Sequence, residues 1–304
     1  MRALLCRGII ALAAPLAHST RAQPINPIVR EGVTETISAH VYVIPDGSVP
    51  LVPNVGIIVG TRATLVVDTG LGARNGEAVV REMRKVTRGT ALYLVTTHVH
   101  PEHDLGASAF PADTTFLRSS DQVKDIAAGG LDLARQFSQR SPFIADLLKD
   151  AAYRPATIVF EKETTIDLGE VRARIVAMGP NHTLGDTIVF VEPDRVLFAG
   201  DLAMKPQPSF MNTASTPAHW LATLTSLEQL QPAHIVPSHG PMGGIELIDG
   251  YRGYLTTIQT RTADLKKAGK TLDEVIVIET NEQAKYPDRA RLSGAIKAAF
   301  AEAP

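Results

Sequence analysis

The feature that most constrains the fold is a group of histidines and carboxylates placed directly after an apolar segment. Residues 91–95 are mostly apolar, and residues 98–104 read His-Val-His-Pro-Glu-His-Asp. Three imidazoles and two carboxylates therefore fall within seven consecutive positions. Imidazole and carboxylate are the protein ligands of zinc, iron and manganese. This segment predicts a metal site at the end of a strand.

Three further apolar segments end in the same way. Residues 173–178 precede His182, residues 196–199 precede Asp201, and residues 234–236 precede His239. Strand ends in a layered α/β domain meet at one edge, so these side chains are expected to lie together. The potential ligands are His98, His100, Glu102, His103, His182, Asp201 and His239. A single catalytic zinc takes three protein ligands and a water, so this set predicts two metal ions that share a carboxylate.

The order and spacing of these segments resemble the metallo-β-lactamase superfamily. Its signature is His-x-His-x-Asp-His, followed by a distant His, a bridging Asp and a last His. The resemblance spans about residues 41–240, and residues 65–70, Leu-Val-Val-Asp-Thr-Gly, are similar to the family's strand and Asp-Thr-Gly turn. The resemblance implies an α/β (α+β) fold, a four-layer αβ/βα sandwich with two mixed β-sheets flanked by helices. The site would lie along one edge of the sheets.

The resemblance also implies a role for each candidate ligand. One metal would be held by three imidazoles and the other by a carboxylate and two imidazoles, with a second carboxylate between them. In that order the residues are His98, His100 and His182, then Glu102, His103 and His239, and finally Asp201. Two Zn²⁺ ions are expected, with iron or manganese as alternatives. Asp68 would orient a ligating imidazole or the loop that carries it.

The chain departs from the family signature at Glu102, where the family has Asp. Both are carboxylates of similar basicity, so ligation by the longer side chain is expected. Asp104 is the alternative ligand, although its position predicts instead a favourable interaction with the N-terminal end of a helix dipole. Lys205 is expected to bind an anionic group of the substrate, the alternative being a solvated loop lysine. His219 is a weaker candidate for substrate contact.

The expected activity is that of an exported zinc-dependent hydrolase. A zinc-activated hydroxide would attack an acyl carbon of an amide or ester type, and Glu102 and Asp201 would orient the nucleophile and accept its proton. A β-lactam is the best single substrate expectation. Two alternatives stay open: a periplasmic hydrolase or accessory protein of quinoprotein or thiosulfate oxidation, and an iron-dependent persulfide dioxygenase. Fold-level analogy does not choose among them.

The N-terminal segment predicts export. Residues 1–22 carry arginines, no acidic residue and an apolar stretch of about ten residues, which is typical of a secretory signal peptide. A periplasmic or secreted location is expected, with a metallo-β-lactamase-fold domain over residues 23–304, its core at about 41–240 and C-terminal helices at 247–304. The only cysteine, Cys6, would be removed with the signal, which leaves no thiolate ligand.

Composition narrows the possible partners. The chain has 30 Lys and Arg against 32 Asp and Glu, without a run of like charges, so no nucleic-acid partner is expected. No long apolar stretch follows the N-terminus, so no membrane span is expected. A small-molecule substrate remains, and the oligomeric state is left open. Helices are expected at 76–86, 247–268 and 289–301, a helical insertion at 121–150, and a flap over the site at 45–50.

Overall fold

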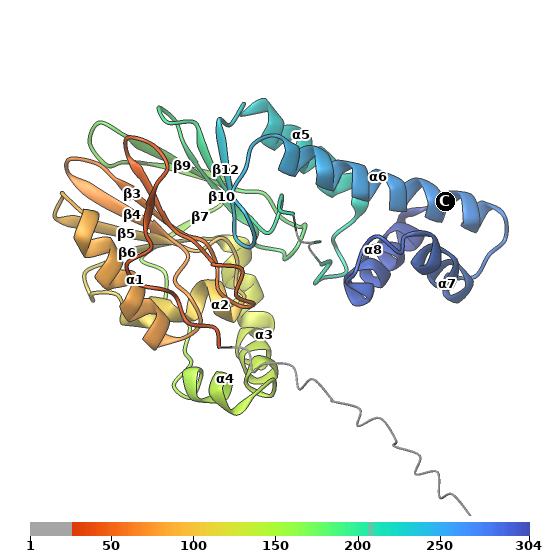
Figure 1. Ribbon diagram of the computed structural model, residues 1–304, viewed down its shortest axis with the longest axis horizontal. Helices are drawn as coiled ribbons and strands as arrows, with labels where there is room; N and C mark the ends of the chain where they lie inside the picture. The colour runs from red at the N-terminus through yellow and green to blue at the C-terminus, as the bar shows by residue number, and fades with distance from the viewer. Residues whose placement is uncertain (1–25, 206, 208) are drawn as a thin grey trace, which may run out of the picture.

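Two β-sheets pack face to face, with helices on both outer sides (Figure 1). The computed structural model describes residues 26–205, 207 and 209–304, so the expected signal peptide at 1–22 lies outside the described residues. The predicted αβ/βα sandwich of two mixed sheets is confirmed.

The first sheet has seven strands in sequence order and the second has five in the order β12-β11-β10-β9-β8. The strands of the first sheet are β1 (Glu35–Thr36), β2 (Val41–Ile44), β3 (Val55–Val59), β4 (Ala63–Val67), β5 (Ala91–Val95), β6 (Thr115–Ser119) and β7 (Ile158–Phe160). Those of the second are β8 (Glu163–Asp167), β9 (Arg172–Ala177), β10 (Thr187–Val191), β11 (Val196–Gly200) and β12 (His234–Pro237). The helices are α1 (Ala73–Val86), α2 (Pro101–Asp104), the 3₁₀ helix η1 (Leu105–Ala109), α3 (Ser120–Ser138), α4 (Pro142–Leu147), α5 (Pro217–Gln229), α6 (Glu246–Lys267), α7 (Leu272–Glu282) and α8 (Arg289–Glu302).

Alternating side chains produce the layers. In β10, Ile188 and Phe190 pack beneath α5 and α6, whereas Val189 and Val191 pack between the two sheets. Successive side chains of a strand point to opposite faces, so a strand covered on both faces is apolar throughout. This explains why the central strands appear in the sequence as short, uninterrupted apolar segments.

Strand direction places the predicted ligands at one edge. Strands β4 to β7 are parallel, β11 and β12 are parallel, and β9 runs with β11 because both are antiparallel to β10. The sheets are tied together at this edge, where the backbone N–H of Thr187 donates to the carbonyl oxygen of Thr97 at 2.7 Å. Loops that carry histidines therefore leave both sheets side by side.

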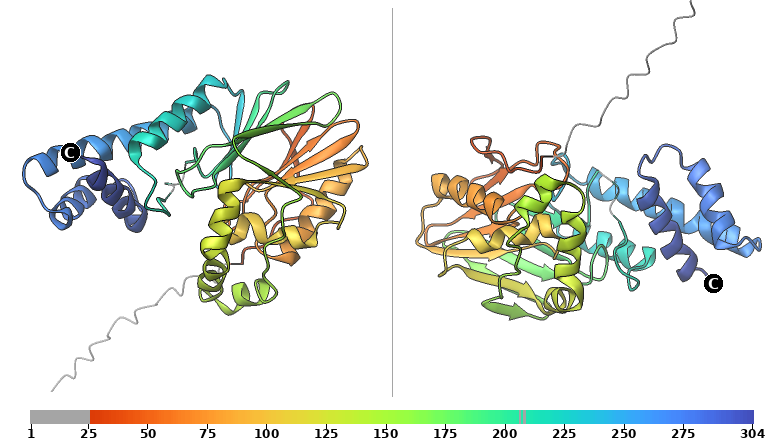
Figure 2. Two further views of the ribbon diagram at one scale, coloured as in Figure 1. Left: turned by 180° about the vertical axis from the view of Figure 1, so that it is seen from behind. Right: turned by 90° about the horizontal axis from the view of Figure 1, so that it is seen from below.

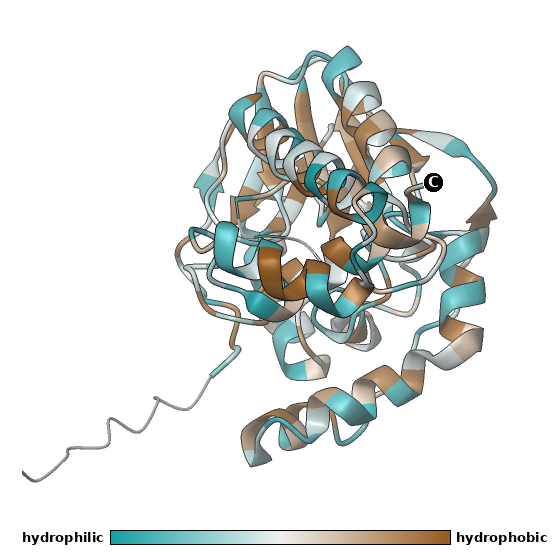
Figure 3. Cartoon of the chain, turned by 90° about the vertical axis from the view of Figure 1, so that its right-hand side faces the viewer, coloured by the Kyte–Doolittle hydropathy of each residue, from teal (hydrophilic) through white to brown (hydrophobic). Residues whose placement is uncertain are grey.

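The C-terminal helices extend away from the sandwich (Figures 1 and 2). Helices α5 and α6 cover the outer face of the five-stranded sheet, and Trp220 is completely buried there, its indole N–H donating to the carbonyl oxygen of Leu202. Figure 3 shows hydrophobic and hydrophilic residues alternating along the helices on this side, as expected of helices with one packed face. Helix α7, for which the sequence analysis assigned no helix, begins with a capping box formed by Thr271 and Glu274.

The predicted helical insertion at 121–150 is present as two helices, α3 and α4, with non-helical backbone at Gly129 inside α3. Among the residues described here, no helix has the length and apolarity needed to cross a membrane.

Candidate metal centre

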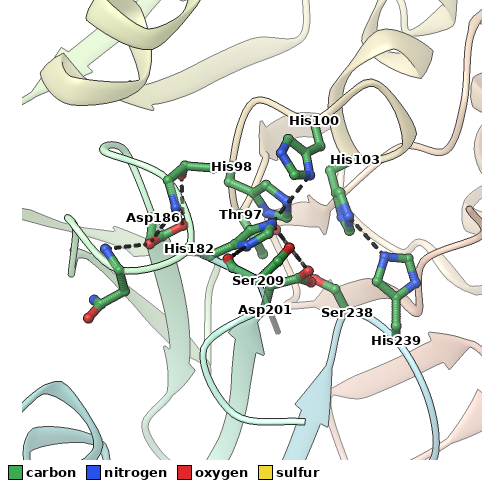
Figure 4. A network of polar contacts seen from close by, with 12 residues as sticks. Thr97, His98, His100, His103, His182, Asp186, Asp201, Ser209, Ser238 and His239 are labelled. Atoms are coloured by element: carbon green, nitrogen blue, oxygen red, sulfur yellow. Dashed lines mark hydrogen bonds and ion pairs between the residues drawn. The ribbon is translucent and has the colours of Figure 1, made fainter. Parts of the chain in front are cut away.

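Four loops at the shared edge bring the predicted ligands together (Figure 4). His98 and His100 follow β5, Glu102 and His103 belong to α2, His182 follows β9, Asp201 follows β11 and His239 follows β12. His239 is partly exposed and the other six are buried. The structure shows where these side chains lie, and their roles as metal ligands remain a prediction.

Three imidazoles converge on one point. One ring nitrogen from each of His98, His100 and His182 lies within 4.8 Å of the others. Nε2 of His182 is 3.3 Å from Nδ1 of His100. The other ring nitrogen of His182, Nδ1, lies 2.6 Å from the carbonyl oxygen of Ser209. Nε2 of His98 is buried and has no hydrogen-bond partner within the described part of the chain. These are the residues that the resemblance implies for the first metal.

A carboxylate and two imidazoles form the second group. Glu102, His103 and His239 each offer an atom within 4.8 Å of the others. The Nε2 atoms of His103 and His239 are 3.2 Å apart, while the Nδ1 atom of His239 is 2.9 Å from the carbonyl oxygen of Val52. Oε2 of Glu102 is buried, again without a partner in the described residues. The longer Glu side chain therefore reaches the position at which the family has Asp.

Asp201 lies between the two groups. It forms a third potential ligand set with His98 and His103, and its Oδ2 is 3.4 Å from Nε2 of His182. Burial opposes its ionisation, but the surrounding imidazoles outweigh that effect and lower its pKa to about 2. An ionised carboxylate with contacts to both groups is suited to bridging two cations.

Asp68 follows β4 and holds His103 in place. Its Oδ2 is 2.9 Å from Nδ1 of His103, so the other ring nitrogen faces His239. The same carboxylate accepts hydrogen bonds from the backbone N–H of Thr97 at 2.7 Å and from the hydroxyl of Ser238 at 3.3 Å. This contact with an imidazole is the one that the resemblance implies for Asp68.

The electrostatics of the centre favour a cation. Burial, followed by the neighbouring imidazoles, lowers the pKa of His98 and His100 well below the usual value, which leaves their nitrogen lone pairs free for a metal. Burial also acts against charge on His103, but Asp68 and then Glu102 outweigh it and raise the pKa of His103 to about 9. The carboxylates thus favour positive charge within the group of Glu102, His103 and His239. The unpartnered buried atoms, the facing imidazoles and this mixed N/O donor set fit two divalent transition-metal ions.

Asp104 requires a correction. The prediction of a helix-terminus role is wrong, because the carboxylate is completely buried and makes a bidentate ion pair with Arg118 of β6. The hydroxyl of Thr96 donates to the same carboxylate at 2.9 Å. Asp104 belongs to none of the potential ligand groups found in the described residues. It fixes α2, which carries Glu102 and His103, to the sheet below.

Several supporting residues were missed by the sequence analysis. Asp186 accepts hydrogen bonds from the backbone N–H groups of Asn181 and Thr183, and so closes the loop that carries His182. The amide of Asn54 donates to the carbonyl oxygens of Pro237 and Gly240 on either side of His239. Asp and Asn are common in ordinary turns, so nothing in the pattern distinguished these two.

A cavity of about 750 Å³ opens over both groups. Residues of the predicted flap line it, together with Phe137 of α3. Three cationic side chains also line it: Arg140 between α3 and α4, Lys205, and Arg291 of α8. Lys205 is placed as expected, Arg140 and Arg291 were not predicted, and His219 is exposed and does not line this cavity.

Comparison with known proteins gives the same classification. The family model described as "Metallo-beta-lactamase superfamily" matches residues 48–239, and this chain belongs to that superfamily.

Two curated proteins show what the chain is similar to. A linear primary-alkylsulfatase of Pseudomonas sp. (strain ATCC 19151) is 21% identical over 267 residues, which cover 76% of this chain and 49% of that protein. The human acyl-coenzyme A thioesterase MBLAC2 is 26% identical over 164 residues, 49% of this chain and 57% of that protein. The chain thus spans about half the length of the curated relatives it matches.

Among solved structures, a metallo-β-lactamase from Pontibacter korlensis superposes with a TM-score of 0.58 at 20% identity, covering 73% of this chain and 98% of that one. At this identity the likeness concerns the fold.

Proposed function

We propose that this protein is a metal-dependent hydrolase of an anionic small molecule, with zinc as the metal and an acyl bond as the target. The observation that supports it is the convergence of Glu102, Asp201 and five imidazoles at the floor of an open cavity. Metal ions held there would belong to two sites, one with three imidazoles and one with a carboxylate and two imidazoles, joined by Asp201. Such ions supply Lewis acidity, which makes water a nucleophile near neutral pH.

The carboxylates of the chain would handle the proton of that water. Oδ1 of Asp201 and Oε2 of Glu102 face the centre and are free of hydrogen bonds within the described residues, so either can accept a proton. The oxygen of water adds to the acyl carbon, the bond to the leaving group breaks, and the proton passes to the leaving group. Asp68 keeps His103 in one tautomer throughout, since its carboxylate contacts Nδ1.

The cavity walls favour an anionic substrate. Lys205, Arg140 and Arg291 come from three different segments of the chain around the opening. The Arg140 guanidinium stacks 3.6 Å above the ring of Phe137, which orders it at the edge of the cavity. Cations spaced around a concave site attract and orient an anion. The β-lactam predicted from sequence carries a carboxylate and stays within this class.

A sulfate ester is the second candidate. The similarity to an alkylsulfatase covers 76% of the chain and supports it. The same cations would bind the sulfate group, and hydrolysis would release an alcohol and sulfate.

A substrate panel tests the proposal. Zinc-loaded protein is assayed with a chromogenic β-lactam, a lactone, an acyl thioester, an alkyl sulfate and a phosphodiester. Turnover of the β-lactam, lactone or thioester that stops with a chelator and returns with zinc supports the proposed acyl-bond activity. Turnover of only the sulfate ester selects the second candidate, and no turnover of any substrate contradicts hydrolysis. Persulfide oxidation by an iron-loaded protein would select the alternative redox activity.

Export is a separate part of the proposal, and it rests on the composition of residues 1–22. Expression of the full chain in a Gram-negative host should yield periplasmic protein that has lost about this segment in an intact-mass measurement. Full-length protein in the cytosol would contradict export.

A further inference from the structure

A second cavity of about 850 Å³ adjoins the one over the metal centre. Three residues line both: Lys205, Pro241 and Arg291. The second cavity lies between α6 and the segment that leads into α8, and none of the predicted metal ligands lines it. A molecule bound at the metal centre can therefore extend past Arg291 into this space.

One face of α6 forms a wall of the second cavity. Its lining residues are Glu246, Leu247, Gly250, Tyr251 and Tyr254, which share one side of the helix because of their spacing of three and four. Gly250 lies in the middle of this face. A Cβ atom added to Gly250 would meet no heavy atom within 4 Å, so the cavity is open where this residue lacks a side chain.

The wall is aromatic and continuous with the core. The rings of Tyr251 and Tyr254 stack with centroids 5.6 Å apart, and the ring of Tyr286 meets that of Tyr254 edge-on at 4.7 Å. Met204 and Met242 line the cavity as well. Aromatic and thioether side chains provide apolar surface that adapts to a flexible ligand.

Both carboxylates that line the cavity have local partners. Asp288 accepts a hydrogen bond from the backbone N–H of Arg291 at 3.0 Å, and its other oxygen is 3.2 Å from the Arg291 guanidinium. Glu246 accepts from the backbone N–H of Gly244 at 2.7 Å. With these charges satisfied locally, the space between them is suited to an apolar group.

We infer that this cavity binds the aliphatic portion of the substrate whose scissile bond lies at the metal centre. The inference rests on the proposed function and narrows its substrate class to amphipathic anions. The anionic end lies near Lys205 and Arg291, where the two cavities meet, and the chain extends along α6. Each methylene that enters the cavity leaves water, so affinity increases with chain length until the cavity is filled.

Binding of a probe that cannot be hydrolysed tests the inference without requiring turnover. Linear alkyl phosphonates from propyl to nonyl, below their aggregation concentrations, are titrated into metal-loaded protein by calorimetry. The dissociation constant should fall by about fourfold for each buried methylene. The variant Gly250→Leu places a side chain in the open space beside α6 and should abolish this dependence. The affinity for propyl phosphonate should change less than twofold.

Gly253→Leu is the matched control. Gly253 is also on α6 and has open space at its Cβ position, but it does not line the cavity. Both substitutions replace a helical glycine, so both raise helix propensity by a similar amount. The control should keep the chain-length dependence of the wild type. Equal dependence in wild type, Gly250→Leu and Gly253→Leu would overturn the inference.

A second measurement does not depend on the folding of a variant. A nonyl phosphonate with a diazirine at the end of its chain is crosslinked to the wild-type protein, and labelled peptides are identified by mass spectrometry. Labels on α6 or on residues 285–291 support the inference, and labels confined to other segments overturn it. Chain-dependent binding without turnover of any substrate would contradict the proposed function alone, whereas turnover with no chain-length dependence of binding would contradict the inference alone.

Discussion

Asp104 lies beneath the metal centre and Glu279 lies among the C-terminal helices, and neither carboxyl group is exposed to solvent. Asp104 makes a bidentate ion pair with Arg118 and accepts a hydrogen bond from Thr96. Glu279 has a single hydrogen bond, from the hydroxyl of Thr262 at 2.5 Å, and its second oxygen has no partner among the described residues. The buried carboxyl group is thus paired with a guanidinium in the first region, whereas in the second it only accepts a hydrogen bond from a hydroxyl group.

The difference shows what burial does to charge. An ion pair in which both carboxylate oxygens accept hydrogen bonds offsets much of the cost of taking Asp104 out of water, and the charge becomes costly to remove. Burial without a cation raises the pKa of Glu279 to about 7 despite the bond from Thr262. Next to the metal centre, the ion pair of Asp104 with Arg118 compensates the buried charge and holds α2 in place. The helical region contains a carboxyl group without an ion pair, and the stability that depends on its protonation is lost as pH rises from about 4.5 to about 7.

The largest expected effect concerns Glu102, the carboxylate at the shared edge of the sheets that belongs to the second group of potential ligands. Glu102→Gln should lower activity by more than the roughly 10–100-fold that changes to outer-shell residues cause, since a charged ligand is lost. The second metal should leave before the first. Glu102→Asp restores the usual ligand of the family and should keep the metal and much of the activity. Metal content and turnover of the same preparations check this.

Loss of metal in Asp104→Asn but not in Glu102→Gln would contradict the assignment. It would mean that the ligand motif begins in a different register, and that the ion pair with Arg118 does not exclude Asp104 from the metal.

The next largest effect concerns the buried ion pair between Asp104 and Arg118. Asp104→Asn leaves the buried guanidinium of Arg118 without its counter-charge, so the free energy of unfolding should fall by about 3–5 kcal/mol. Urea unfolding of the metal-free protein measures this. Asp132→Asn removes an exposed pair with Arg135 and should change stability by no more than about 1 kcal/mol. Equal effects of the two substitutions would show that the buried pair of Asp104 and Arg118 contributes no more to stability than an exposed pair.

The smallest expected effect is an increase in the free energy of unfolding. Glu279 keeps its proton in the folded state up to a pH of about 7, whereas the unfolded chain releases it near 4.5, so stability falls as pH rises between these values. Glu279→Gln keeps the acceptor for Thr262 and removes this loss. It should leave stability unchanged at pH 4 and raise it by up to about 3 kcal/mol at pH 8.

Unfolding curves at several pH values check the prediction for Glu279. Asp273→Asn, an exposed change on the same helix, should keep the pH dependence of the wild type. A destabilised Glu279→Gln variant at pH 8 would show that the carboxylate is compensated after all.

Much of the sandwich was predictable because its strands are uninterrupted apolar segments. The apolar segments 91–95, 173–178, 196–199 and 234–236 largely coincide with β5, β9, β11 and β12, and the loops that follow these strands carry the side chains that meet at the shared edge. The family resemblance implied two mixed sheets flanked by helices, but the order of the strands within each sheet was not predicted. The N-terminal signal and the location of the protein stay predictions.

The misses have physical reasons. Residues 275–278 of α7 are Val-Ile-Val-Ile, a pattern without helical period, and the capping box at Thr271 with tertiary packing decides in favour of a helix. Asp104 was assigned from its place in a helix, but its partner Arg118 is one strand away and sequence spacing does not reveal the pair. Arg291 reaches the cavity from the last helix, a long-range contact of the same kind.

Metal stoichiometry tests the central claim most directly. Protein purified without chelators, then exchanged into metal-free buffer, is analysed for zinc, iron and manganese against protein concentration. The account predicts two zinc ions per chain, falling to one in Glu102→Gln. One iron per chain with no zinc, or no bound metal in active protein, would contradict it.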